Sequence, residues 1–120
     1  MMNIKQAKIK PIIKFADFEK VDIRVGTIKE VFDIESSDKL VKLIVDFGNL
    51  ERVVIVGMKN ERDNPKEIEG KQALFVVNVE PREIMGNVSE AMLFDIGYED
   101  KITPVLAMPE KPVSNGARAG

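Results

Sequence analysis

The sequence predicts an all-β fold, a five-stranded barrel with one short helix and an extension at each end. Three observations predict it. Five apolar or alternating segments are spaced along the chain, a glycine interrupts the first, and a polar segment between the third and fourth has the composition of a short helix. With 120 residues, 44% of them hydrophobic and 32% charged, the chain is long enough to bury one core.

The first predicted strand covers residues 21–34. Apolar and polar residues alternate up to Gly26, and the apolar phase then continues, which predicts a long strand bent at a glycine bulge. Just before this strand, Asp17 is placed to cap a short helical turn. We expect Phe15 and Phe18 to pack that turn onto the body of the protein.

The next two segments predict a hairpin. In residues 38–48 the expected inward face holds Val41, Leu43, Val45 and Phe47, and Lys42 and Asp46 fall on the other face. Gly48 and Asn49 form the expected turn, and residues 51–57 form the third strand.

A loop and a central strand follow. Residues 58–71 are polar, and their composition predicts a loop with a short helix from about Pro65 to Glu69. Residues 71–79 are apolar on both faces, which is typical of a strand covered on both sides.

The last predicted strands are shorter. Residues 89–98 alternate again, with Met92, Phe94 and Ile96 on one face and Ala91 and Leu93 on the other. This alternation favours a core position as the structural alternative for Met92. One more short strand is expected at about residues 104–108. Three prolines, Pro104, Pro109 and Pro112, cannot donate ladder hydrogen bonds, so we expect the C-terminal tail at an edge or on the surface.

Together these elements favour a barrel of the OB type, because five evenly spaced strands carry a glycine bend and a helix before the fourth strand. Periodicity alone leaves a β-sandwich as the alternative. We expect residues 1–14 to form a basic arm and residues 15–120 to form the barrel domain.

The composition excludes much of enzyme chemistry. The chain has no cysteine and no histidine, so it has no disulfide, no thiol nucleophile, no Ser-His-Asp triad and no usual zinc ligands. No glycine-rich pattern is present that would bind a nucleotide phosphate. We therefore expect no catalysis, no cofactor and no metal. Because no long apolar run and no signal-peptide pattern occur, a cytoplasmic protein is expected.

The charge is unevenly distributed along the chain. The formal net charge is −2, which by itself argues against a nucleic-acid partner. The first 14 residues carry four lysines, at positions 5, 8, 10 and 14, and no acid; the rest carries 14 basic and 20 acidic groups. The arm therefore has a charge of +4 and the body one of −6. The arm is either a solvated tail or a contact for a polyanion.

Four stretches, taken in order, resemble the tRNA-binding domain family. They are DFEKVDIRVGTI, DKLVKLIVDFG, VNVEPREIMGNVSEAML and PEKPVSNGARAG, within residues 17–120. The family includes the appended domain of methionyl-tRNA synthetases, free-standing tRNA-binding proteins, cytokine-like synthetase accessory domains and the export-related chaperone CsaA. The resemblance implies an OB-fold homodimer without catalytic activity that recognises the outer corner of folded tRNA by shape, alone or in trans to a methionyl-tRNA synthetase.

The resemblance also implies an RNA-binding site in the third stretch, where a proline, an arginine, a glycine and a serine separate two apolar segments. Asn78 would end the fourth strand, Arg82 would reach a phosphate, and Gly86 would permit a close approach or a positive φ. Ser89 would donate to sugar or phosphate oxygens. Met85 and Met92 would receive an unstacked base. The candidates for a basic rim are Lys39, Lys42, Arg52 and Lys59.

Structural alternatives remain for each of these residues. Gly86 alternatively serves only to close a turn, and Ser89 only to cap a strand. Arg82 alternatively forms only a surface ion pair with Glu80 or Glu83. Single lysines on strands are commonly only solvated. The resemblance implies a dimer interface formed by Val21, Ile23, Arg24, Val25, Ile102, Pro104, Val105 and Pro112, although Arg24 faces either the partner or RNA.

Three departures from the family pattern bear on the partner. Asp38 is preceded by DIESS rather than by the more common His-Pro pattern, Val56 replaces a serine, and Glu90 follows Ser89, as in CsaA-like members. An acid beside the proposed phosphate donor argues against RNA. The alternative partner is therefore an unfolded or precursor polypeptide, bound by an acidic, methionine-containing groove.

Overall fold

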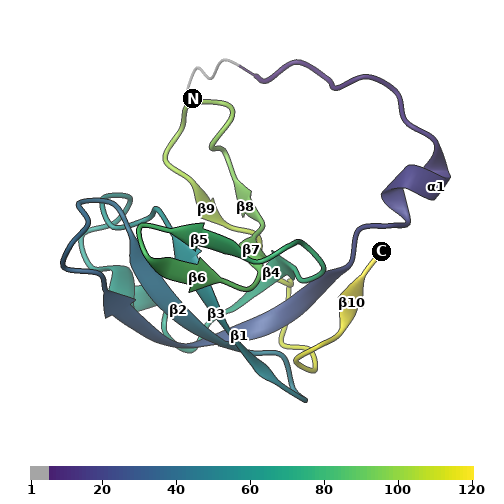
Figure 1. The fold of residues 1–120 in the computed structure, drawn as a ribbon. Helices are drawn as coiled ribbons and strands as arrows, with labels where there is room; N and C mark the ends of the chain where they lie inside the picture. Colours follow the sequence, from purple (N-terminus) through teal and green to yellow (C-terminus); the bar gives the residue numbers. More distant parts are fainter. Residues whose placement is uncertain (1–5) are drawn as a thin grey trace.

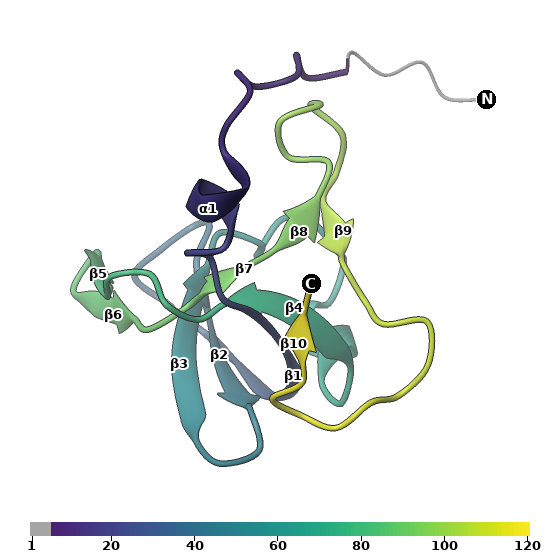
Figure 2. The same cartoon turned by 90° about the vertical axis from the view of Figure 1, so that its right-hand side faces the viewer.

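The computed structural model describes residues 6–120 and contains a nearly closed, antiparallel five-stranded barrel (Figures 1 and 2). The barrel strands follow the order β3-β2-β1-β4-β7. They are β1 (Ile23–Asp33), β2 (Val41–Asp46), β3 (Glu51–Val56), β4 (Gln72–Val76) and β7 (Met92–Leu93). The OB-type barrel predicted from the sequence is confirmed. The 3₁₀ helix η1 (Pro65–Ile68) lies between β3 and β4, as predicted.

Within the described part of the chain, five short strands lie outside the barrel. They are β5 (Arg82–Ile84) paired with β6 (Asn87–Ser89), β8 (Asp95–Ile96) paired with β9 (Val105–Leu106), and β10 (Arg118–Ala119) paired with the start of β1. The predicted continuous strand over residues 89–98 is therefore divided among β6, β7 and β8. Figure 1 shows the β8–β9 hairpin projecting away from the barrel, and Ala7 N–H donates to Asp100 Oδ1 near its tip.

β1 serves two neighbours because it is long and bent. Its first half pairs with β4 and its second half with β2. The predicted bulge at Gly26 is wrong: Gly26 keeps regular pairing with Ala73, and the register shift falls between Ile28 and Glu30. Gly26 has a different role. A Cβ atom there would lie 2.5 Å from Val45 Cγ1, so glycine lets β1 pass close to β2.

The core occupies the barrel interior and matches the predicted inward face of β2. Val41, Leu43, Val45 and Phe47 are all buried. Phe47 packs edge-on against Phe75 of β4, with ring centroids 5.4 Å apart. The alternative that places Met92 in the core is wrong, because Met92 is 48% exposed while Ala91 and Leu93 face the core. A slip of one residue in phase reverses every side chain of a strand.

Side chains, rather than a regular ladder, close the seam between β3 and the segment before β7. The hydroxyl of Ser89 accepts from Ile55 N–H at 3.0 Å and donates to Ala91 C=O at 2.9 Å. The carboxylate of Glu90 accepts from Val53 N–H at 2.8 Å, and Glu90 N–H donates to Val53 C=O. These two residues therefore satisfy both backbone groups of Val53 and the N–H of Ile55 at the edge of β3 that does not face β2.

The N-terminal helix α1 (Phe15–Phe18) has no buried residue. Two predictions fail here. Asp17 lies inside the helix, whose N-cap is Lys14 without a side-chain hydrogen bond. The rings of Phe15 and Phe18, with centroids 6.5 Å apart, are both exposed rather than packed into the core. Of the predicted arm lysines, Lys8, Lys10 and Lys14 are exposed, and Lys5 lies outside the described residues. Among residues 6–120, no helix has both the length and the apolar content needed to cross a bilayer.

Two partly buried acids predict a pH effect on stability. Burial raises the pKa of Asp95, and burial together with the charge of Asp95 raises the pKa of Glu61. An acid whose pKa is raised in the folded state makes the fold more stable as pH falls through that pKa. We expect Asp95→Asn to raise Tm at pH 7 and this gain to shrink towards about pH 4. Thermal unfolding across this range measures it, and a gain that does not change with pH would contradict the assignment.

Candidate nucleic-acid interface

The stretch that interrupts the apolar pattern forms a β-hairpin. Arg82 pairs with Ser89 and Ile84 with Asn87, and the two turn residues, Met85 and Gly86, have φ values of +50° and +81°. Positive φ at both central positions is the type I′ turn, whose twist matches that of paired strands. No protein atom lies within 4 Å of a Cβ placed on Gly86, so within this chain the positive φ, rather than packing, requires the glycine.

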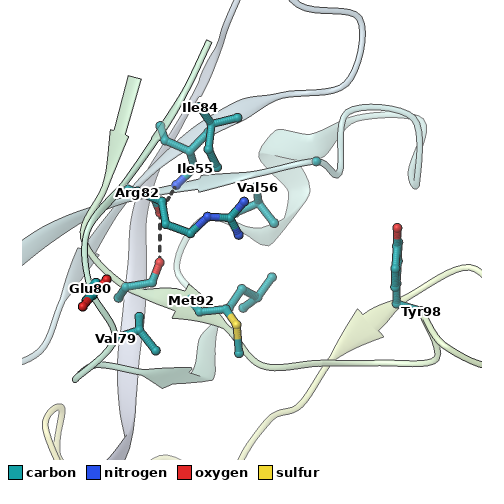
Figure 3. Close-up of a pocket in the computed structure, with 12 residues that line it drawn as sticks. Ile55, Val56, Val79, Glu80, Arg82, Ile84, Met92 and Tyr98 are labelled. Carbon is teal, nitrogen blue, oxygen red and sulfur yellow. Dashed lines mark hydrogen bonds between the residues drawn. The ribbon is translucent and has the colours of Figure 1, made fainter. Parts of the chain in front are cut away.

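A mostly apolar pocket of about 420 Å³ lies where this hairpin, β3 and β7 meet. Its walls include Ile55, Val79, Arg82, Ile84, Met92 and Tyr98. Figure 3 shows the Arg82 side chain extended across the pocket, with Met92 beneath it and Tyr98 farther along. One cationic group thus lies over an apolar floor, which suits a ligand that has both a flat apolar part and an anionic part.

Arg82 is exposed, and among the described residues it forms no salt bridge. The expected alternative, an ion pair with Glu80 or Glu83, is therefore not present. Its guanidinium keeps its hydrogen-bond donors for a ligand. Two further apolar side chains near it, Met85 and Val88, are more than half exposed on the hairpin.

Two of the residues predicted to contact RNA, Ser89 and Asn78, instead form hydrogen bonds that stabilise the fold. The hydroxyl of Ser89 is engaged on both sides in the barrel seam and the residue is only 7% exposed, which corrects the expectation of an accessible donor. Asn78 lies two residues beyond the end of β4. Its side chain accepts from Asp22 N–H at 2.8 Å and donates to Lys20 C=O at 2.6 Å. Asn78 therefore ties the start of β1 to the end of β4.

The predicted basic rim separates into two groups. Arg52 donates to the carbonyls of Val77 and Glu90. Lys59 donates to the carbonyls of Ile34 and Ser37 and lies 2.7 Å from Asp33 Oδ1. Both side chains are thus committed to the fold. Lys39 and Lys42, in contrast, form no salt bridge within residues 6–120.

Sequence reasoning missed two exposed aromatic residues: Tyr98, which lines the pocket and is 69% exposed, and Phe32. Phe32, near the end of β1, is 39% exposed, and the ammonium groups of Lys42 and Lys66 lie 5.2 and 5.7 Å from its ring centroid. The sequence contained a signal for the exposure of Phe32. It follows Val31 directly in a strand, and since Val31 faces inward, Phe32 faces outward. Within the described residues, no cluster of three or more Asp, Glu, His or Cys side chains is arranged to hold a metal.

The residues predicted for a dimer interface differ in accessibility. Val21, Val105 and Pro112 are exposed, and Ile23 and Ile102 are half-buried. Val25 and Pro104 are already buried within one protomer, so they offer little surface to a partner.

Arg24 is bound within its own chain. Its Nε and Nη2 donate to the carboxylate of Asp22 at 2.9 and 3.1 Å, and its Nη1 donates to Gly116 C=O at 3.2 Å. Hydrogen bonds from Arg24, and also from Arg118, hold the pKa of Asp22 below its usual value despite partial burial. Neither the partner nor RNA is needed to explain this arginine.

Comparison with known proteins identifies a family. Residues 23–118 match the family described as "Putative tRNA binding domain". The methionine–tRNA ligase of Parabacteroides distasonis is 37% identical over 115 residues, which is 96% of this chain and 17% of that protein. The ligase of Pyrococcus horikoshii is 38% identical over 114 residues, 95% of this chain and 15% of that protein. The chain spans about a sixth of the length of these relatives.

Solved structures of similar size share the fold. A methionyl-tRNA synthetase-related protein from Pyrococcus horikoshii superposes with a TM-score of 0.84 at 36% identity, covering 92% of this chain and 100% of that one. The chaperone CsaA from Picrophilus torridus gives a TM-score of 0.79 at 29% identity, covering 91% and 100%. CsaA from Bacillus anthracis gives 0.77 at 26% identity, covering 92% and 100%.

Proposed function

Because the chain belongs to the tRNA-binding domain family, we propose that it is a non-catalytic cytoplasmic protein that binds folded tRNA through the face carrying the β5–β6 hairpin. One observation supports the choice of the hairpin face as the binding surface. Arg82 has no salt-bridge partner among the described residues, and it extends over an apolar pocket. A phosphate would meet its guanidinium while an unstacked base enters the pocket beside Met92.

We further propose that recognition depends on the shape of the outer corner of tRNA more than on its base sequence. Folded RNA presents phosphates, 2′-hydroxyl groups and a few unstacked bases in a fixed arrangement. The hairpin has a defined turn and a seam fixed by Ser89 and Glu90, so it offers a rigid complement to such an arrangement. The Glu90 carboxylate accepts from Val53 N–H, which holds this acidic side chain at the edge of β3.

A salt titration with an arginine variant tests the proposal. If about five phosphates are contacted, log affinity for folded tRNA should fall against log salt with a slope of roughly −3.5 to −4.5. Arg82→Gln should weaken binding and make the slope shallower by about 0.7 to 0.9, the share of one phosphate. Fluorescence anisotropy of labelled tRNA at four salt concentrations measures both quantities.

The matched control is Lys111→Gln, which makes the same change in net charge on the exposed C-terminal tail. It should leave the slope unchanged. Equal affinity for folded and heat-denatured tRNA, or equal effects of the two substitutions, would count against the proposal.

We propose that the protein is a homodimer. The apolar surfaces of α1, of Val21 and of Val105 are exposed in the single chain, and a twofold axis would let two copies cover them. Sedimentation equilibrium should give about twice the 13.4 kDa chain mass. Since the chain spans only part of its ligase relatives, a synthetase acting in trans is a further proposed partner.

A second candidate function is binding of unfolded polypeptides, as the CsaA neighbours suggest. The apolar pocket beside Met92 and Tyr98 favours it, because methionine side chains adapt to varied apolar segments. Stoichiometric suppression of the aggregation of a denatured enzyme, unaffected by excess tRNA, would support this function over the first.

A further inference from the structure

Phe32 is the most exposed aromatic side chain of the barrel strands. It lies near the end of β1, beside the inward-facing Val31, which is 1% exposed. Lysines from two other elements flank its ring, Lys42 from β2 and Lys66 from η1. An exposed aromatic ring with two ammonium groups over it is thus built from three separate parts of the chain.

The charges around this ring differ in availability. Lys66 Nζ donates to Val31 C=O at 2.8 Å and lies 3.7 Å from Glu69 Oε2, so it is held by the protein. The neighbouring carboxylate of Asp33 is paired with Lys59 at 2.7 Å. Lys42 forms no salt bridge among residues 6–120. Its ammonium is therefore available to an anion beside the ring.

Phe32 lies on the same outer face of the sheet as the pocket beneath the hairpin, although it does not line that pocket. In the sheet register Phe32 pairs with Lys42, and Lys42 pairs with Ile55, which lines that pocket. Two strand spacings, about 10 Å, separate Phe32 from Ile55. The ring lies at the far end of β1 from β10, which pairs with Ile23 and Arg24. A dimer formed around the start of β1 would leave Phe32 and Lys42 accessible to a ligand.

We propose that Phe32 is a stacking platform for an unpaired nucleobase of the bound RNA, with Lys42 contacting an adjacent phosphate. The inference rests on the proposed tRNA-binding function and adds a second base site to it. Every base has a π-face, so stacking on an exposed ring accepts any of the four bases. Lys66, whose ammonium lies over the ring and is held by Val31 C=O, acts as a positioning residue. The competing explanation is that the two lysine side chains only cover an exposed apolar ring.

Substitutions at Phe32 and Lys42 separate stacking from charge. Phe32→Leu keeps an apolar side chain but removes the aromatic face, and it should weaken binding of folded tRNA roughly 5- to 100-fold with an unchanged salt slope. Phe32→Tyr keeps the face and should retain wild-type affinity. Lys42→Gln should make the slope shallower by about 0.7 to 0.9.

A second variant gives a direct signal. The chain contains no tryptophan, so Phe32→Trp introduces a single fluorescent reporter at the platform. Stacking of a base should quench its emission as folded tRNA is added, at the concentrations at which anisotropy reports binding.

Two outcomes would contradict the proposed role of Phe32 and leave the proposed tRNA-binding function unaffected. They are a Phe32→Leu protein that binds tRNA within twofold of wild type, and an emission from Phe32→Trp that bound tRNA leaves unchanged. If the wild-type protein itself fails to bind folded tRNA, the proposed function fails first. Circular dichroism melting of each variant distinguishes a loss of binding from a loss of folding.

Discussion

Replacing Gly26 with alanine is expected to destabilise the protein by about 1–3 kcal/mol, towards the upper end of that range. The new methyl carbon would lie 2.5 Å from Val45 Cγ1 and 2.8 Å from Phe47 Cε1. Both neighbours are buried core side chains, so neither moves without disturbing the barrel interior. For a domain of this size the loss corresponds to a fall in Tm of about 4–12 °C.

Gly57 provides the matched control for this substitution. It has no atom within 4 Å of an added Cβ and no positive φ, so Gly57→Ala should change stability by less than about 0.5 kcal/mol. Urea unfolding of both variants measures the difference. Equal effects at the two glycines would show that close packing of β1 on β2 is not what requires Gly26.

The second large effect is expected at Ser89. Ser89→Ala removes the acceptor of Ile55 N–H and the donor to Ala91 C=O. An unsatisfied buried backbone group costs about 1–3 kcal/mol, so the seam between β3 and the segment before β7 should weaken by at least that amount. Amide hydrogen exchange at Ile55 should accelerate together with the loss of stability.

Ser36→Ala is the control for the serine substitution, because Ser36 is exposed on the loop before β2. It should leave both Tm and the exchange rate at Ile55 unchanged. A Ser89→Ala protein with wild-type stability but weakened tRNA binding would contradict the structural role and restore Ser89 as a direct contact.

The barrel was predictable because its strands carry strong local patterns. Val41, Leu43, Val45 and Phe47 recur at every second position, with Lys42 and Asp46 on the opposite face, and Pro65 marks the helix that precedes the fourth strand. Each of these signals depends only on residues close together in the chain. They therefore fixed element type and inward face without knowledge of the tertiary contacts.

The features that failed depend on distant contacts. The role of Ser89 is set by Ile55, which belongs to another strand, and the exposure of Phe32 is set partly by Lys66 of η1. The phase error at Met92 arose because the predicted strand over residues 89–98 is broken into separate pieces. Long-range hydrogen bonds and strand breaks leave little trace in local periodicity.

The candidate site was predicted in part. The interruption between two apolar segments indicated the place of the hairpin. Arg82 lies on its strand β5, and Gly86 has the positive φ that its turn requires. The division of the polar residues into those held by the fold and those available to a ligand could not be predicted. That division follows from hydrogen bonds such as those of Asn78, which only the folded chain brings together.

Binding of folded tRNA by the hairpin face is the central claim, and a titration of the isotopically labelled full chain followed by backbone amide NMR tests it most directly. The largest shift changes and line broadening should fall on β5, β6 and β7, and on the neighbouring ends of β1 and β2. Changes confined to α1 and β10, with the hairpin signals unaffected by saturating tRNA, would contradict it.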